Sequence, residues 1–215
     1  AAYLAGKVGT PLYIAHVTSR EAMAEIQEAK GKGINVNGES CTHYLTTTKE
    51  VLDNPDFNEA AKYVCSPALR DQEDVDALWD ALNSGLLTAI SSDHCGIDVA
   101  ELKQAGRDDF TQIPNGSPGA GDRFSMIWTY GVEAGRISKQ KFVELVSTNP
   151  AKINGIFPQK GTIEIGSDAD IVIFDPTYRG VVRLEDNPNG VDYNVYEGRD
   201  MIGKVETVLL RGTVG

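Results

Sequence analysis

Two apolar segments of this 215-residue chain each end in a side chain that can hold a metal ion or move a proton. The segment PLYIAHVTS, residues 11–19, delivers His16, and the segment LLTAISSDHC, residues 86–95, delivers Asp93. Parallel α/β barrels build their active sites from ligands and bases at the carboxyl ends of strands. The two segments therefore indicate a hydrolytic metal site, with Asp93 as a ligand or a base.

The chain is short of metal ligands. Its only histidines are His16, His43 and His94, whereas a metal site needs three or more protein ligands. We interpret His43, in a loop after the second predicted strand, as a solvated residue outside the site. On position alone, His16 could equally be a hydrogen-bonded structural histidine, and Asp93 could cap a turn or a helix. Their joint occurrence at the ends of two strands favours a functional role.

Strand and helix patterns alternate around these two residues. Ser19 is a suitable N-cap and Gly33 a suitable stop for the first helix. The pattern predicts a strand that ends at His16, a helix over residues 19–32, a strand over 34–40, an extended segment over 62–70 interrupted by Pro67, a helix over 71–85 and a strand over 86–93. These are about three β-α units with parallel strands, and three units cannot close a barrel of eight.

The second half of the chain changes character. A polar, Gly-rich loop over residues 96–122 precedes two predicted helices, residues 123–135 and 138–147, the second capped by Ser138. From Gly161 onward, alternating Ile and Val residues predict short antiparallel strands around Gly166, and residues 203–215 predict one more strand. We place a boundary near Phe157 and expect a β-rich unit after it. The fold class is α/β.

Composition limits the possible partners. The chain has 31 Asp and Glu against 20 Lys and Arg, a formal charge of −11, which disfavours nucleic acid and acidic membrane surfaces. It has no apolar run of 18 residues, so we expect no membrane span. Three widely spaced cysteines without a CxxC motif fit a reducing cytoplasm better than a disulfide framework. The chain starts without Met at what reads as the end of a helix, and we interpret it as internal to a longer protein.

The Gly-rich loop over residues 113–123 does not match two common catalytic motifs. IPNGSPGAGDR lacks the Gly-Lys-Ser/Thr ending of a phosphate-binding loop, and Pro118 removes a backbone donor. The sequence around Ser117 is not a GxSxG nucleophile elbow, and no histidine follows His94 to complete a triad. Serine hydrolase chemistry is therefore disfavoured.

Several segments together resemble the dihydropyrimidinase and hydantoinase family of cyclic amidohydrolases. They are YIAHVTS, NGESCTHYL, KYVCSPALRDQED, SSDHC, GRDDFTQIPNGSPG, GRISKQKFVELVSTNPAKINGIFPQKGTIEIGSDADIVIFDP and VDYNVYEG. The resemblance extends over nearly the whole chain in one order. It implies a metal-dependent (β/α)8 TIM barrel flanked by a β-sandwich, of which this chain is the C-terminal portion. Residues 1–157 would be the last part of the barrel, and residues 158–215 part of the sandwich with an oligomer-contacting tail.

The resemblance also implies a site and a reaction. Family members bind two divalent metal ions, usually zinc, through a His-x-His pair, a carboxylated lysine, two later histidines and an aspartate. His16 matches one of the later histidines and Asp93 the aspartate, while the other ligands would lie upstream of this chain. A metal-bridged hydroxide would open the cyclic amide of a dihydropyrimidine or hydantoin to an N-carbamoyl amino acid, with Asp93 carrying the proton. Backbone groups at Ser66 and Asn115 would hold the ring, and the whole protein would be a tetrameric cytoplasmic enzyme.

Two departures from the family pattern lie at the predicted substrate pocket. Ala68 follows Pro67 where many relatives have a second proline, and residues 40–43 read Ser-Cys-Thr-His where many have Thr-Cys-Pro-Gln. Two alternatives stay open: a non-catalytic relative used for protein–protein interaction, and a sister enzyme that acts on allantoin or dihydroorotate.

Overall fold

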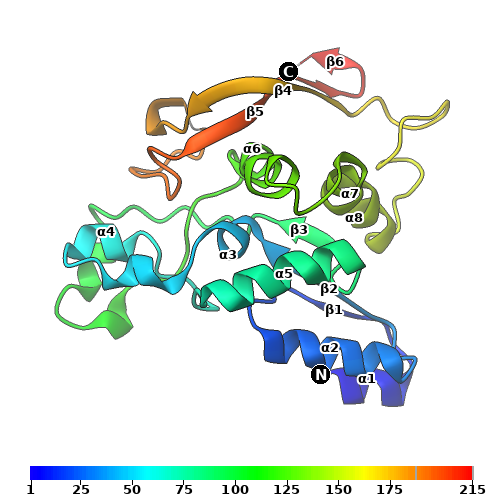
Figure 1. Cartoon of the computed structure of the whole chain (residues 1–215), viewed down its shortest axis with the longest axis horizontal. Helices are drawn as coiled ribbons and strands as arrows, with labels where there is room; N and C mark the ends of the chain where they lie inside the picture. The colour runs from blue at the N-terminus through cyan, green and yellow to red at the C-terminus, as the bar shows by residue number, and fades with distance from the viewer. Residues whose placement is uncertain (187, 215) are drawn as a thin grey trace.

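The computed structural model describes residues 1–186 and 188–214 as stacked layers of helices and sheets (Figure 1). Helices α1 (Ala2–Val8), α2 (Arg20–Gly31) and α5 (Gln72–Ser84) lie beside a three-stranded parallel sheet. A second group of helices lies between that sheet and a β-hairpin at the far side of the molecule. The result is a mixed α/β arrangement with an open parallel sheet, as expected for part of a barrel.

The parallel sheet is formed by strands β1 (Leu12–Ile14), β2 (Val36–Cys41) and β3 (Ala89–Ser91), in that order. Both pairings are parallel. The predicted parallel strands are thereby confirmed, although β1 and β3 are shorter than the apolar runs that contain them. All three strands end at one edge of the sheet, the edge at which barrel enzymes place their chemistry.

Local sequence chemistry explains the two helices that connect these strands. The Ser19 side chain accepts a hydrogen bond from the backbone N–H of Ala22 at 3.3 Å and starts α2. Gly85, with a φ of 83°, ends α5 in the left-handed region that favours glycine. Both helices turn an apolar stripe inward, against the sheet. The predicted helices over residues 19–32 and 71–85 are confirmed.

Two longer helical runs follow the third strand. The first joins α6 (Arg123–Ile127) to the π-helical turn η4 (Trp128–Glu133), and Ser138 caps the second by accepting from the N–H of Lys141 at 3.0 Å. The second joins α7 (Lys139–Val143), the π-helical turn η5 (Glu144–Thr148) and α8 (Asn149–Ile153). It runs beyond the predicted end because Pro150 lies in the first turn of α8, where a missing N–H is tolerated.

The loop predicted over residues 96–122 and several other connecting segments contain short helices. These are α3 (Thr42–Thr46), η1 (Lys49–Asp53), α4 (Phe57–Ala61), η2 (Lys103–Gly106), η3 (Phe110–Gln112) and η6 (Leu184–Asp186). The segment 62–70, predicted to be extended, forms turns and an irregular stretch instead. Its backbone bonds to loop backbone and to side chains instead of to a neighbouring strand: the N–H of Lys49 donates to the carbonyl of Arg70 at 2.9 Å, and the Tyr44 hydroxyl donates to the carbonyl of Pro67 at 2.7 Å.

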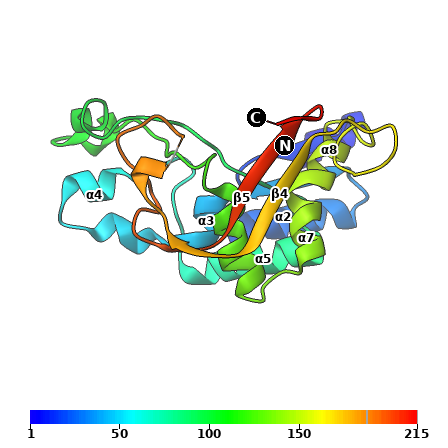
Figure 2. The same cartoon turned by 90° about the horizontal axis from the view of Figure 1, so that it is seen from above.

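An antiparallel sheet covers the second group of helices. It consists of β4 (Ile171–Val181), β5 (Asp200–Leu210) and β6 (Thr213–Val214), and Figure 2 shows β4 and β5 running side by side across the helices. The strand expected around Gly166 begins only at Ile171, because the preceding residues form turns held by Lys160, which pairs with Asp168 and Asp170. The antiparallel pairing itself is confirmed.

The hairpin and the helices below it share one apolar core. The rings of Trp128 and Phe142 lie 5.4 Å apart between centroids, and Phe174 of β4 lies 5.0 Å from Trp128. Gly203 of β5 has a φ of 79°, and a Cβ there would lie 2.4 Å from the Phe174 ring. Only glycine allows this close approach. In the described part of the chain, no helix is both long and apolar enough to cross a membrane.

Candidate active site at the carboxyl ends of the parallel strands

His16 and Asp93 occupy equivalent places at the edge of the sheet. Each lies two residues beyond its strand, His16 after β1 and Asp93 after β3. Their φ values are 40° and 45°, in a region that non-glycine residues rarely adopt. Such a backbone costs on the order of 1 kcal/mol or more and gathers at functional sites. The same strain at two strand ends supports a functional role for both side chains.

The segment that follows β2 lies between these two residues. Neighbouring strands are about 4.8 Å apart, so β1 and β3 are separated by roughly 10 Å. The N–H of Val17 donates to the carbonyl of Glu39 at 2.8 Å and fixes the chain beside His16 to β2. Burial, and to a lesser extent the charge of Asp93, raises the pKa of Cys41, and burial followed by the charge of His16 lowers the pKa of His43. Both candidates therefore border residues 41–43.

The interpretation of His43 as a solvated loop residue is wrong. Its side chain lies at the start of α3, and only 7% of the residue is exposed. Its Nε2 atom has no hydrogen-bond partner among the described residues, and its ring centroid lies 4.0 Å from that of Tyr44. Burial, and then the nearby charge of His16, lower the pKa of His43 to about 4. The imidazole is thus neutral at neutral pH.

A chain of polar side chains crosses the three strands below the candidate site. The Tyr13 hydroxyl donates to Glu39 Oε2 at 2.6 Å, and the Ser91 hydroxyl donates to Glu39 Oε1 at 2.8 Å. Ser91 Oγ also lies 3.2 Å from Cys41 Sγ. Desolvation raises the pKa of Cys41 to about 12, so this thiol stays protonated at neutral pH. The network links the three strands just before the site edge.

Ser66 and Asn115, predicted to hold substrate, are both exposed and belong to two segments that bond to each other. The N–H of Gly116, next to Asn115, donates to the carbonyl of Val64 at 3.0 Å. The loop around Asn115 also reaches the strand end of Asp93, because the N–H of Cys95 donates to the carbonyl of Ser117 at 3.0 Å. These bonds join both predicted substrate segments to the β3 end of the site.

The donor set fits a metal site only in part. His16 and Asp93 offer an imidazole and a carboxylate, which suit zinc and similar divalent ions. Across residues 1–186 and 188–214, however, no three His, Cys, Asp or Glu side chains are grouped closely enough to hold an ion. Further ligands would have to come from outside the described residues.

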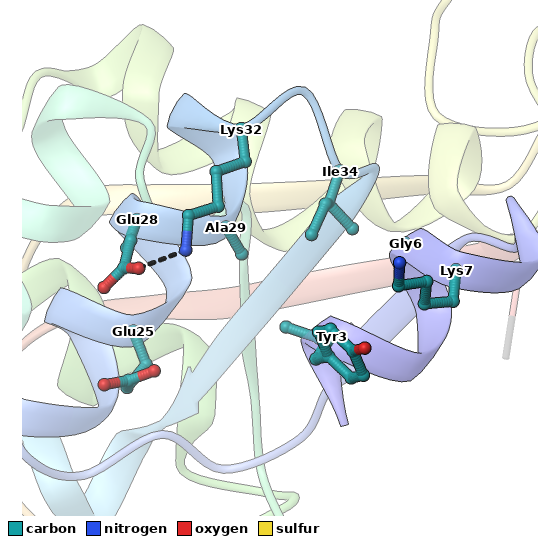
Figure 3. A pocket seen from close by; sticks show the side chains of 9 residues that line it. Tyr3, Gly6, Lys7, Glu25, Glu28, Ala29, Lys32 and Ile34 are labelled. Atoms are coloured by element: carbon teal, nitrogen blue, oxygen red, sulfur yellow. Dashed lines mark hydrogen bonds and ion pairs between the residues drawn. The ribbon is translucent and has the colours of Figure 1, made fainter.

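A separate hollow of about 340 Å³ lies between α1 and the C-terminal half of α2 (Figure 3). The side chains of Tyr3 and Lys7 line it on one side, and an ion pair between Glu28 and Lys32 lines it on the other. Since α2 starts near His16 and runs back toward the beginning of β2, this hollow lies toward the amino ends of the strands. It is not part of the candidate site.

Sequence reasoning missed two residues near the site, Glu39 and Lys103. Glu39 lies in a strand whose apolar and polar residues alternate. The sequence around it does not distinguish its carboxylate from that of an ordinary solvent-exposed residue. Lys103 lies in a charged loop, ELKQAGRDD, where a lysine normally faces solvent. Only the tertiary structure shows that it is fully buried.

Comparisons with known proteins agree with this geometry. The model of the amidohydrolase family matches residues 13–214. The D-hydantoinase of Ralstonia pickettii is 50% identical over 211 residues, which cover 98% of this chain and 46% of that protein. The dihydropyrimidinase of Arabidopsis thaliana is 41% identical over 211 residues, 98% of this chain and 40% of that protein.

Solved structures give the same result. The crystal structure of dihydropyrimidinase from Brevibacillus agri superposes with a TM-score of 0.96 at 46% identity, covering 99% of this chain and 46% of that one. The L-hydantoinase from Arthrobacter aurescens gives a TM-score of 0.89 at 32% identity, again covering 99% and 46%. The chain thus spans a little under half the length of these relatives. It belongs to the amidohydrolase family, and within that family it is similar to D-hydantoinases and dihydropyrimidinases.

Proposed function

We propose that the protein to which these residues belong hydrolyses the amide bond of a cyclic dihydropyrimidine or hydantoin and releases an N-carbamoyl amino acid. The observation that carries the proposal is the shared backbone strain of His16 and Asp93 at the carboxyl ends of the two outer parallel strands. The similarity to D-hydantoinases and dihydropyrimidinases over nearly the whole chain supports it.

His16 and Asp93 would contribute to holding two divalent metal ions, with zinc as the proposed metal and a carboxylated lysine among the remaining ligands. Such ions supply Lewis-acid chemistry: they polarise a carbonyl and lower the pKa of a bound water. The half-exposed His16 and the exposed Asp93 leave their donor atoms accessible for this role.

The side chain of Asp93 would move the proton. Its carboxylate accepts a proton from the attacking water as the new C–O bond forms at the ring carbonyl, and returns it to the ring nitrogen as the C–N bond breaks. The backbones of Ser66 and Asn115 would hold the imide edge of the ring meanwhile. Gly116 supports this arrangement, since its φ of 142° lets the main chain turn beside Asn115.

The remaining attributes follow the same proposal. The substrate is a small molecule of pyrimidine catabolism or a related hydantoin, and neither nucleic acid nor a membrane is a partner. The complete protein would be a homo-oligomer, a tetramer, in the cytoplasm.

The two alternatives have less support. A non-catalytic relative has no physical need for strained backbone under an imidazole and a carboxylate, whereas both are present here. An enzyme acting on allantoin or dihydroorotate would share the barrel and its metals. The relatives compared above are named for hydantoins and dihydropyrimidines instead.

A hybrid enzyme tests the proposal directly. Residues 1–215 would replace the matching stretch of the Ralstonia pickettii D-hydantoinase, which is 50% identical over 211 aligned residues. We expect the folded, zinc-loaded hybrid to open hydantoin and dihydrouracil rings, measured by the loss of ultraviolet absorbance. A folded hybrid with the relative's metal content but no turnover on either ring, or with turnover on dihydroorotate alone, would contradict the proposal.

A further inference from the structure

Lys103 is a lysine with no solvent exposure at all, its residue being 0% accessible in η2. Its ammonium group donates to three main-chain carbonyls: Ala61 at 2.7 Å, Gly116 at 2.8 Å and Val64 at 3.2 Å. An ammonium has three protons to donate, so the three carbonyls account for all of them. The side chain ties the backbone at Ala61 and Val64 to the backbone at Gly116, which is more than fifty residues away in sequence.

These carbonyls belong to the two segments proposed to bind substrate. Val64 lies two residues before Ser66, and Gly116 directly follows Asn115. The same two segments are joined by the Gly116 N–H, which donates to the carbonyl of Val64 at 3.0 Å. Lys103 therefore bridges the Ser66 and Asn115 segments through its side chain, while one backbone hydrogen bond joins the two segments directly.

The surroundings of Lys103 hold it in place without neutralising it. The ring of Tyr193 lies below its ammonium, 5.8 Å from Nζ to the ring centroid, and the Tyr193 hydroxyl also approaches the carbonyl of Gly116 at 3.4 Å. The ion pairs found among the described residues do not include Lys103. Desolvation lowers the pKa of Lys103 to about 8. A buried cation that is held by carbonyls and an aromatic ring, without a carboxylate partner among the described residues, is a costly way to fill space. This cost points to a geometric task.

Glycine at position 106 shows how closely this loop is packed. A Cβ at Gly106 would lie 2.0 Å from the Ile113 side chain and 2.8 Å from its backbone nitrogen. The turn that carries Lys103 thus presses against the start of the segment that carries Asn115. The turn and the Asn115 segment are thus held together by packing as well as by the hydrogen bond from Lys103 to Gly116.

We propose that Lys103 is a positioning residue for substrate binding: its ammonium sets the separation between the Ser66 and Asn115 backbones that grip the cyclic imide. The inference rests on the proposed function and adds to it a residue that need not touch the substrate. Loss of the ammonium would weaken binding of the ring but leave His16 and Asp93 in place.

The test is Lys103→Met in the zinc-loaded hybrid enzyme, since methionine keeps an apolar stem and removes the donors. We expect KM for hydantoin to rise at least about tenfold while kcat falls less than about threefold, the pattern of lost uniform binding. The metal content should stay that of the unsubstituted hybrid. Lys30→Met is the matched control, because Lys30 also donates to a main-chain carbonyl, that of Leu86 at 2.7 Å, but at the other end of the sheet. An unchanged KM for Lys103→Met, or the same KM for Lys103→Met and Lys30→Met, would overturn the inference.

Amide hydrogen exchange gives a second readout that does not depend on turnover. In Lys103→Met the Gly116 amide should exchange at least about tenfold faster, whereas Lys30→Met should leave it unchanged. Equal protection of Gly116 in all three proteins would refute the positioning role, even if the hybrid proved inactive and the proposed function failed. If Lys103→Met does not fold, Lys103→Gln replaces it in both tests. Its amide keeps two N–H donors on a shorter side chain, and this variant must show both the raised KM and the faster exchange of the Gly116 amide.

Discussion

His16 and Asp93 both take a positive φ, 40° and 45°, at the points where the two outer strands of the parallel sheet end. Within the described residues, only Arg211 among the other non-glycine residues does the same. Two strained residues at matching strand ends are difficult to explain by packing, because a residue with ordinary geometry would close either turn at lower cost. The relationship makes the proposed role of both side chains open to direct tests.

Replacing Asp93 by Asn in the hybrid enzyme should abolish ring opening. An amide cannot accept and return the proton, and loss of general acid–base catalysis typically costs 10²–10⁴-fold. The measurement is kcat for hydantoin, with circular dichroism to show that the fold is retained. Asp53→Asn, at an exposed carboxylate in η1, is the control and should leave kcat unchanged. A near-normal rate for Asp93→Asn would exclude Asp93 as the proton carrier.

The 215-residue chain by itself should not turn over dihydrouracil or hydantoin, even with added zinc. The described residues do not group three metal-binding side chains, so a zinc ion would be held too weakly to support hydrolysis. The assay is the same absorbance measurement, with the hybrid enzyme as the positive control. Any turnover by the purified chain that rises with its concentration would show that this expectation is wrong.

Replacing Gly131 by Ala should destabilise the protein by about 1–3 kcal/mol. A Cβ at Gly131 would lie 2.8 Å from the Trp79 ring, and Trp79 cannot move freely because its indole N–H donates to the carbonyl of Leu45 at 3.0 Å. Gly31→Ala is the control: at the end of α2 a Cβ meets nothing within 4 Å, so that change should be neutral or slightly stabilising. Denaturant titration measures both, and equal stabilities would contradict the packing argument.

Lys103 should make the stability of the protein depend on pH in the alkaline range. Its pKa is about 8 in the fold and 10.5 in the unfolded chain, so between these values the unfolded chain binds more protons and the free energy of unfolding rises with pH. Between pH 7.5 and pH 10.5, the free energy of unfolding of the unsubstituted protein should rise relative to that of Lys103→Met, by about 3 kcal/mol at most. The other ionisable groups are the same in both proteins, so the difference between the two stability curves reports Lys103. Parallel stability curves for the two proteins would contradict this expectation.

Local chemistry explains which parts of the structure the sequence could predict. Ser19, Ser138 and Gly85 mark helix ends through bonds made within a few residues, so those boundaries were predictable. The burial of His43 and of Lys103 depends on segments tens of residues away, and no local pattern announces it. The strand ends that carry His16 and Asp93 were predictable from apolar runs, whereas the bonds that join the Ser66 and Asn115 segments appear only in three dimensions.

The aromatic contact of Trp128, Phe142 and Phe174 has a practical consequence. A chain truncated near residue 157 would lack the hairpin that covers these rings. The exposed apolar surface would then promote aggregation. Engineers who exchange parts between relatives should therefore move the hairpin together with the helices it covers. A substitution at this contact, in the hairpin or in the helices, requires a compensating substitution in the other partner.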